Sequence, residues 1–321
     1  MKRNRGRIAV MVWAVMMWIG LGCLAACSEQ VYIPSSGNTD EVTTAGPVWE
    51  IPSGNPFENA PHVLYADFLN TGDSDAILLR ADDTVILVDT GESDDYPAIS
   101  RRLNELGISE INYLILTHFD NDHIGTVSQI LQAYTVEHVY MPAYVRESVL
   151  YRRMMNTLET VSRTILHRVT DEVRIELPYG SMWINPTRLY APEETLGSDD
   201  SHSLEENNYS LITSINFGER SLLLMGDAEQ DRILEFMEVA GKDAVYDVIK
   251  IPHHGGYDKA LSDLLRQSVG LRYCMIHVGE ASHAKDKLMT AVRSVGAAAY
   301  LTCNGDIRFS TDGVSMLVEQ K

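Results

Sequence analysis

From residue 62 onward, short apolar runs along the chain alternate with longer stretches of helical spacing. Runs rich in branched and aromatic residues predict buried strands, and apolar residues three or four positions apart predict helices with one buried face. The predicted strands are Val63–Phe68, Ala76–Leu79, Thr84–Asp89, Tyr113–Leu116, Glu137–Met141, Val173–Leu177, Thr187–Tyr190, Leu211–Phe217, Ser221–Leu224, Val248–Ile251, Tyr273–Val278 and Ala299–Thr302. The predicted helices are Tyr96–Leu106, Gly125–Tyr134, Arg146–His167, Glu229–Val239, Ala260–Val269 and Ala284–Val295. No internal repeat or second linker interrupts this pattern, which therefore predicts one mixed α and β domain over residues 62–321.

The first 61 residues have a different composition. Met1–Arg7 carries four basic residues and Ile8–Ala26 is almost wholly apolar, as in a secretory signal peptide, although such a run could also span a bilayer. Leu24-Ala25-Ala26-Cys27 resembles a bacterial lipoprotein processing site, so we predict a lipoprotein signal peptide over residues 1–27 with Cys27 as the lipidation site. An uncleaved anchor and plain secretion are the alternatives, and all three place the protein outside the cytoplasm. Residues 28–61 are rich in Ser, Gly, Thr, Asn and Pro, which predicts a flexible tether.

Four potential metal ligands lie within six consecutive positions. They are His118, Asp120, Asp122 and His123, in the sequence Thr-His-Phe-Asp-Asn-Asp-His-Ile-Gly that follows the apolar run Ile111–Leu116. Imidazoles and carboxylates bind zinc, manganese or iron, and a loop at the carboxyl end of a strand is a usual place for a site. A single Asp or Asn here would be typical of a turn or a helix cap. Four such residues together predict a metal site.

The motif His-x-Asp-x-Asp-His resembles the central motif of the metallo-β-lactamase fold, which is usually His-x-His-x-Asp-His. In this chain, Asp120 stands at the position of the usual second His. This variant is similar to the soluble domain of ComEC-type DNA-uptake proteins. Further matches follow in the order the family requires: Ile86–Glu92 resembles its Asp-Thr-Gly turn, Ser221–Asp227 its strand ending in Gly-Asp, and Val248–Gly256 its strand ending in His-His-Gly. The resemblance implies an α+β fold, the αββα four-layer sandwich, as a catalytic domain over residues 62–321.

The resemblance also implies one or two divalent metal ions, zinc or manganese, and assigns their ligands. His118 and Asp120 would bind the first metal, Asp122, His123 and His254 the second, and Asp227 would bridge the two. His253 is the alternative to His254, and would otherwise contact the substrate. No third ligand for the first metal is evident, because the segment before Asp227 offers Glu206, Asn207 and Asn208, with His202 upstream. These oxygen ligands favour manganese or magnesium, with zinc and occupancy of the second site alone as alternatives.

For catalysis, the resemblance implies hydrolysis by a metal-activated hydroxide. Two cations about 3.5 to 4 Å apart lower the pKa of a shared water and hold the attacking and leaving oxygens. Asp122 would orient the hydroxide. His283, between a predicted strand and helix, would stabilise charge on the substrate or leaving group, unless it is only a residue at a helix start. Lys250 is expected to be structural.

The charge balance argues against a simple transfer of a DNA substrate from the family. The chain has 26 basic and 45 acidic side chains, and loss of the four basic residues of the signal peptide would take its net charge from -19 to -23. Such a balance repels polyanions, whose binding depends on Lys and Arg. Five arginines lie largely off the apolar stripe of the predicted helix Arg146–His167, either as an ordinary solvated face or as a lip for an anionic substrate; they are Arg146, Arg152, Arg153, Arg163 and Arg168.

Three functions follow as hypotheses. The first is an extracytoplasmic hydrolase of phosphodiester bonds in nucleic acid or a cell-envelope polymer, attached to the membrane by a lipid on Cys27. The second is a metallohydrolase of lactones, thioesters or β-lactams, and the third is a non-catalytic, metal-containing binding protein. A role in competence would require a separate membrane channel as partner, and the oligomeric state is not predicted. Cys274 and Cys303 lie in apolar runs, where they could form a bridge or stay as buried thiols.

Overall fold

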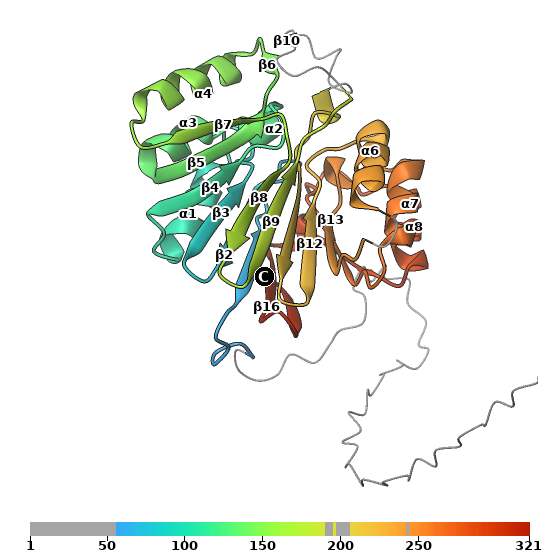
Figure 1. Ribbon diagram of the computed structural model, residues 1–321. Helices are drawn as coiled ribbons and strands as arrows, with labels where there is room; N and C mark the ends of the chain where they lie inside the picture. The colour runs from blue at the N-terminus through green and yellow to red at the C-terminus, as the bar shows by residue number, and fades with distance from the viewer. Residues whose placement is uncertain (1–55, 190–194, 197–205, 242–243) are drawn as a thin grey trace, which may run out of the picture. The chain divides into compact units, whose positions relative to one another are not determined.

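The computed structural model describes residues 56–189, 195–196, 206–241 and 244–321 (Figure 1). The predicted signal peptide, Cys27, most of the predicted tether and His202 lie outside these residues. The side chain of Phe57 is only 3% exposed, so the folded part begins before the predicted boundary at residue 62. Within the described ranges, no helix combines the length and the apolar character needed to cross a membrane.

Two large sheets form the centre of the fold. The first has the strand order β17-β16-β1-β2-β3-β4-β5-β7 and comprises β1 (Leu64–Phe68), β2 (Ile77–Ala81), β3 (Thr84–Val88), β4 (Glu110–Ile115), β5 (Thr135–Pro142), β7 (Ile165–Val169), β16 (Ile307–Thr311) and β17 (Met316–Gln320). The second has the order β15-β14-β13-β12-β11-β9-β8 and comprises β8 (Val173–Leu177), β9 (Gly180–Asn185), β11 (Ile212–Phe217), β12 (Arg220–Leu224), β13 (Val248–Lys250), β14 (Tyr273–Ile276) and β15 (Ala298–Leu301). A short parallel pair joins β6 (Val145–Arg146) to β10 (Thr195–Leu196).

Helices cover the outer face of each sheet (Figure 1). The first sheet carries α1 (Tyr96–Glu105), α2 (Asn121–Ile124), α3 (Val127–Ala133) and α4 (Val149–Thr160), and the second carries α6 (Gln230–Ala240), α7 (Lys259–Gln267) and α8 (Asp286–Ser294). Three apolar clusters separate these layers: one lies between the sheets, and one lies under each helical layer. Burial of each large apolar side chain contributes about 1.5 to 3 kcal/mol. The predicted αββα sandwich is thereby confirmed.

The helix predicted over Arg146–His167 is wrong at both ends. Arg146 belongs to β6, and α4 begins only at Val149, where the Ser148 hydroxyl caps it by accepting a hydrogen bond from the Tyr151 N–H (3.1 Å). The segment after α4 turns into strand β7, which pairs in parallel with β5. The Thr164 hydroxyl donates to the Val136 carbonyl (2.8 Å) and holds this segment against β5. Tertiary pairing overrides the local helical spacing.

Strand positions also differ from the prediction at β9 in the second sheet and at β16 and β17 in the first sheet. Thr187–Leu189 of the strand predicted at Thr187–Tyr190 do not form a strand, and Tyr190 lies outside the described residues. The strand here is β9, which ends before Pro186, because proline cannot donate to a sheet ladder. The hairpin of β16 and β17 was not predicted. Every residue of β17 is only half-buried, and its apolar run, Met316–Val318, is too short to indicate a buried strand by itself.

The topology brings several loops to one edge of the sandwich. β3, β4 and β5 run parallel in the first sheet, and β12, β13 and β14 run parallel in the second. Their carboxyl ends are followed by Asp89, Thr117, Asp227, His253 and His277. The Leu211 N–H donates to the Thr117 carbonyl (2.9 Å) and ties the two sheets together at this edge. The predicted site residues therefore converge from loops of both sheets.

Candidate metal centre

The loop that carries the metal-ligand motif is fixed by the neighbouring Asp89. The Thr117 N–H and hydroxyl donate to the two carboxylate oxygens of Asp89, at 2.8 and 2.7 Å. Gly125 closes the loop, because a Cβ at this position would lie 2.4 Å from the backbone carbon of Glu92. Both His118 and His123 are fully buried. These contacts fix the backbone of the loop, and the surrounding packing encloses both imidazoles.

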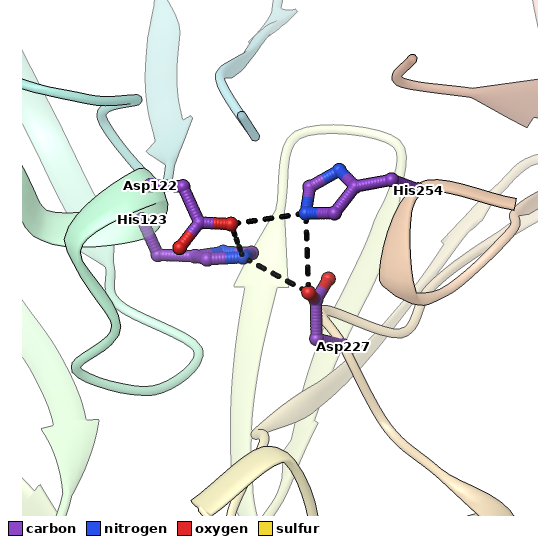
Figure 2. A group of neighbouring side chains, drawn as sticks. All are labelled: Asp122, His123, Asp227 and His254. Carbon is purple, nitrogen blue, oxygen red and sulfur yellow. Dashed lines mark hydrogen bonds and ion pairs between the residues drawn. The ribbon is translucent and has the colours of Figure 1, made fainter. Parts of the chain in front are cut away.

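Four predicted ligands come together in one group. Asp122, His123, Asp227 and His254 each offer one ligand atom within 4.8 Å of all the others, and Figure 2 shows them facing a common point. The Nε2 atom of His254 lies 3.0 Å from Asp122 Oδ2 and 3.2 Å from Asp227 Oδ2. The Nε2 atom of His123 lies 3.4 Å from each of these two oxygens, and it is buried without a hydrogen-bond partner. Two imidazoles and two carboxylates are suited to a divalent cation.

The carboxylate of Asp227 presents only one oxygen to this group. Its Oδ1 atom accepts a hydrogen bond from the His253 N–H (3.1 Å) and lies 3.5 Å from the Lys250 ammonium. Its Oδ2 atom faces the two imidazoles. The preceding Gly226 has a φ of 53°, and a Cβ there would lie 2.7 Å from Thr117 Cβ. The Gly-Asp sequence thus permits the close turn that aims Asp227.

The tandem histidines point in different directions. Both have a left-handed backbone, with φ of 50° at His253 and 49° at His254, in the short helix η2 (His253–Gly255). His254 joins the group of four, whereas the His253 side chain is 44% exposed and lies 3.1 Å from Glu229. The structure therefore places His254, not His253, among the candidate ligands. Left-handed conformations of ordinary residues cost energy and are concentrated at functional sites.

A buried charge network lies behind the group, and it was not expected from the sequence. Lys250, fully buried, contacts Asp75 and donates to the Gly226 carbonyl (2.9 Å). The fully buried His277 lies 3.4 Å from Asp75 through its Nδ1 atom. Asp75, Asp89 and His123 also form a group of ligand atoms within 4.8 Å, but the Lys250 ammonium already supplies a cation to Asp75. Only the structural role of Lys250 had been anticipated, and no sequence pattern marked Asp75 or His277.

The residues predicted for a first metal are arranged differently. His118 Nε2 lies 3.5 Å from Asp120 Oδ2, and the His118 ring is 4.1 Å from the His123 ring. Within the described ranges, neither His118 nor Asp120 joins a third residue in a metal-binding group. Asp120 Oδ1 instead lies 2.5 Å from the buried Arg146 guanidinium. These two residues therefore do not fit a metal site as the four-residue group does.

His283 is exposed in the loop between β14 and α8. This loop packs on the tandem histidines: the Lys285 N–H donates to the Gly255 carbonyl (3.2 Å), and a Cβ at Gly255 would lie 3.0 Å from Ala284 Cα. The structure thus places His283 near the edge of the centre but shows no contact between it and the four ligands.

Charges in the group stabilise one another. Burial disfavours the charged form of His254, but the nearby Asp227 and Asp122 outweigh burial and raise its pKa to about 10. Burial would likewise raise the pKa of Asp122, but His123 and His254 hold it below its usual value. The neighbouring carboxylates also raise the pKa of His123 well above its usual value, so protons compete with a cation for both imidazoles. A divalent cation has to displace these protons, because metal ligation requires neutral imidazole.

Metal affinity is accordingly expected to rise with pH. The raised pKa of His254 stabilises the metal-free fold fully below the unfolded pKa of about 6.5, and this stabilisation is lost as pH rises through about 10. Because the pKa of His254 is about 10, protons compete with the metal ion for its imidazole at neutral pH, and this competition weakens as pH rises from 6.5 to 8.5. Calorimetric titration with Mn²⁺ in two buffers of different ionisation enthalpy should show proton release and tighter binding at higher pH. A pH-independent affinity without proton release would contradict the assignment of His254.

Asp89 is expected to support metal binding without being a ligand. Its Oδ2 atom lies 2.8 Å from His123 Nδ1, which leaves Nε2 as the free ligand atom of His123. Loss of such a support typically weakens metal affinity about 10- to 100-fold. Asp89→Asn should show this loss in a Mn²⁺ titration, while Asp94→Asn, at an exposed position, should bind as the wild type does. Equal affinity of both variants would contradict the role of Asp89.

Comparisons with known proteins agree with this geometry. The family model of the metallo-beta-lactamase superfamily matches residues 69–269. The chain is 27% identical to Recombination protein 2 of Haemophilus influenzae over 210 residues, which are 63% of this chain and 22% of that protein. It is 25% identical to ComE operon protein 3 of Bacillus subtilis over 226 residues, 63% of this chain and 26% of that protein. The predicted resemblance to ComEC-type proteins is confirmed, although the chain spans only about a quarter of these relatives.

A solved structure shows the same fold. The metallo-beta-lactamase fold protein YhfI from Bacillus subtilis is similar over 80% of this chain and all of that chain, with a TM-score of 0.50 and 12% sequence identity. The family match covers more than half of the chain and contains the central motif, Asp227 and His254. The protein therefore belongs to the metallo-beta-lactamase superfamily and has its hydrolase fold.

Proposed function

We propose that this protein is an extracytoplasmic, metal-dependent hydrolase of phosphodiester bonds. Its substrate would be a nucleic acid or a phosphodiester-linked polymer of the cell envelope. A lipid on Cys27 would attach it to the membrane, and a competence role would require a separate membrane channel. The single observation that carries the proposal is the group of Asp122, His123, Asp227 and His254, whose ligand atoms face one point.

The donor set supports a phosphodiester in preference to a lactone or a β-lactam. The group contains two carboxylates, and neither of the cysteines in the described ranges belongs to it. The two carboxylates suit hard cations such as Mn²⁺, which in turn bind phosphoryl oxygens. The relatives add to this, because one is named Recombination protein 2 and matches 63% of this chain. Zinc would also suit the two imidazoles.

The residues of the centre have distinct roles in the proposed reaction. When bound, a divalent cation would lower the pKa of a water molecule and polarise a phosphoryl oxygen. Asp122, at the start of α2, would hold the cation and orient the attacking water. His253 is exposed beside the centre and would contact the substrate phosphate. His283, in the loop that packs on Gly255, would stabilise charge on the leaving group.

A hydrolysis screen tests the proposal. The full-length protein, loaded with Mn²⁺ or Zn²⁺, is assayed with bis(p-nitrophenyl) phosphate, a chromogenic lactone and a chromogenic β-lactam. The phosphodiester should be hydrolysed, and Asp122→Ala should abolish that activity while Asp83→Ala, in the exposed turn before β3, retains it. Turnover of the lactone or the β-lactam alone, lost in Asp122→Ala, would show that the substrate class is wrong. Elemental analysis with less than half a metal per chain would contradict the metal centre itself.

The proposed membrane attachment has a separate test. Cys27→Ser should abolish lipidation, so the precursor should be processed differently and the protein released from the membrane fraction. If processing and membrane association were unchanged in Cys27→Ser, the lipoprotein assignment would be wrong. The enzymatic proposal would be unaffected by that result.

A further inference from the structure

A buried arginine lies where the family resemblance places the first metal ion. Arg146 is 6% exposed, and its Nη1 atom lies 2.5 Å from Asp120 Oδ1 and in contact with Glu206 Oε2. Glu206 is itself 2% exposed. The Arg146 guanidinium therefore bridges two carboxylates. One is Asp120 of the central motif, and the other is Glu206, in the segment where the family usually supplies the third ligand of the first metal.

The surrounding structure fixes both partners of Arg146. The Tyr144 hydroxyl donates to Glu206 Oε1 (2.6 Å) and accepts a hydrogen bond from the Phe119 N–H (2.8 Å). Tyr144 is 1% exposed and packs against Phe119, with 4.5 Å between the ring centroids. Strand β6 carries Arg146 two residues further along the chain. Glu206 is thus linked to the motif loop through a buried tyrosine, and the arginine spans from Glu206 to Asp120.

We infer that the Arg146 guanidinium takes the place of the first metal ion, so that the centre binds a single divalent cation, in the group of Asp122, His123, Asp227 and His254. This inference rests on the proposed metal centre. It goes beyond the two-metal arrangement that the resemblance implies, because it assigns Arg146 as the fixed cation that neutralises Asp120 and Glu206.

Geometry and charge support this assignment. With Asp120 Oδ1 paired to Arg146, only Asp120 Oδ2 and His118 Nε2 face each other, 3.5 Å apart, and two ligands are fewer than a stable site requires. The guanidinium is a planar cation with several N–H donors, so one Arg146 side chain can pair with both carboxylates at once. A second divalent cation would have to enter beside that charge.

Removing Arg146 would leave two buried carboxylates unpaired. Such carboxylates are costly to bury and attract a cation strongly. In Arg146→Met, which has a side chain of similar length without charge, Asp120, Glu206 and His118 would together offer a site for a second cation. Arg146→Lys keeps the charge and should not open that site.

Metal stoichiometry tests the inference without any activity measurement. Full-length protein is dialysed against increasing Mn²⁺, metal per chain is measured by elemental analysis, and electron paramagnetic resonance distinguishes isolated from coupled Mn²⁺. We expect one ion per chain with an uncoupled spectrum in the wild type, in Arg146→Lys and in Asp120→Asn. Asparagine can still accept from Arg146, so Asp120→Asn tests the point even if Arg146→Met does not fold. A folded Arg146→Met should bind a second ion.

The opposite results would overturn the inference. They are two coupled ions per wild-type chain, or loss of a metal ion in Asp120→Asn. Circular dichroism of each variant shows whether it is folded. The outcomes also separate this inference from the proposed function. A two-metal phosphodiesterase would refute only the role of Arg146, and a one-metal protein without phosphodiesterase activity would refute only the proposed substrate.

Discussion

Replacing Lys250 by methionine is expected to lower the free energy of unfolding by about 3 to 5 kcal/mol, the usual cost of removing one partner of a buried ion pair. Lys250 is fully buried and contacts Asp75, Asp227 and the Gly226 carbonyl. Burial alone would lower its pKa, but Asp75 and Asp227 outweigh burial and raise it. Methionine fills a similar volume, so the loss would arise from unpaired carboxylates and not from a cavity. Chemical denaturation of the metal-free protein measures it.

Two further variants make this expectation specific. Lys259→Met, at the exposed first residue of α7, should change stability by less than about 0.5 kcal/mol. The double variant Lys250→Met/Asp75→Asn should recover part of the loss, because the unpaired charge of Asp75 is then absent as well. If Lys250→Met were as stable as Lys259→Met, the ammonium would not be holding this network together.

Asp227→Asn is expected to reduce metal affinity by more than the 10- to 100-fold typical of a supporting residue. The Oδ2 atom of Asp227 lies 3.4 Å from His123 Nε2 and 3.2 Å from His254 Nε2, the nitrogens that face the centre. An amide keeps the shape of the side chain and can still accept from the His253 N–H, but it removes a negative charge from the centre. Mn²⁺ titration measures the affinity, and the phosphodiester assay should show a parallel loss of activity.

The control for Asp227→Asn is Asp258→Asn. Asp258 caps the nearby helix α7 by accepting from the Leu261 N–H (2.7 Å), and asparagine is an equally good cap. This control should therefore bind Mn²⁺ as the wild type does. If the two variants bound Mn²⁺ equally, Asp227 would not be a ligand of the centre.

Much of the centre could be predicted because its ligands follow apolar strands in short, ordered motifs. Asp122 and His123 follow β4, Asp227 follows β12, and the tandem histidines follow β13. The choice between His253 and His254 could not be made from sequence, because it depends on two consecutive left-handed residues. Asp75 and His277 were missed for a related reason. Asp75 is the last residue of a polar loop and His277 is a single polar residue in an apolar run, and only the packing of both sheets brings them to Lys250.

The errors in the fold also have a physical origin. Between Ser148 and Val169 the apolar residues keep a helical spacing, yet the chain leaves the helix after Thr160 and adds strand β7 to the edge of the first sheet. Ile165 in this strand is 54% exposed, so an apolar residue at this position does not indicate a buried helix face. Arg146 was grouped with surface arginines for the same reason. Spacing along the chain cannot show that it is buried between two carboxylates.

The origin of the four ligands in loops of different sheets has a consequence for folding. Asp122 and His254 are 132 positions apart in the sequence, and their side chains meet only when both sheets are packed together. A cation held by both would act as a reversible cross-link that closes a long loop, and it cannot form in either half alone. Metal uptake would therefore be a late event in folding, and metal content would report how many chains in a preparation have completed it.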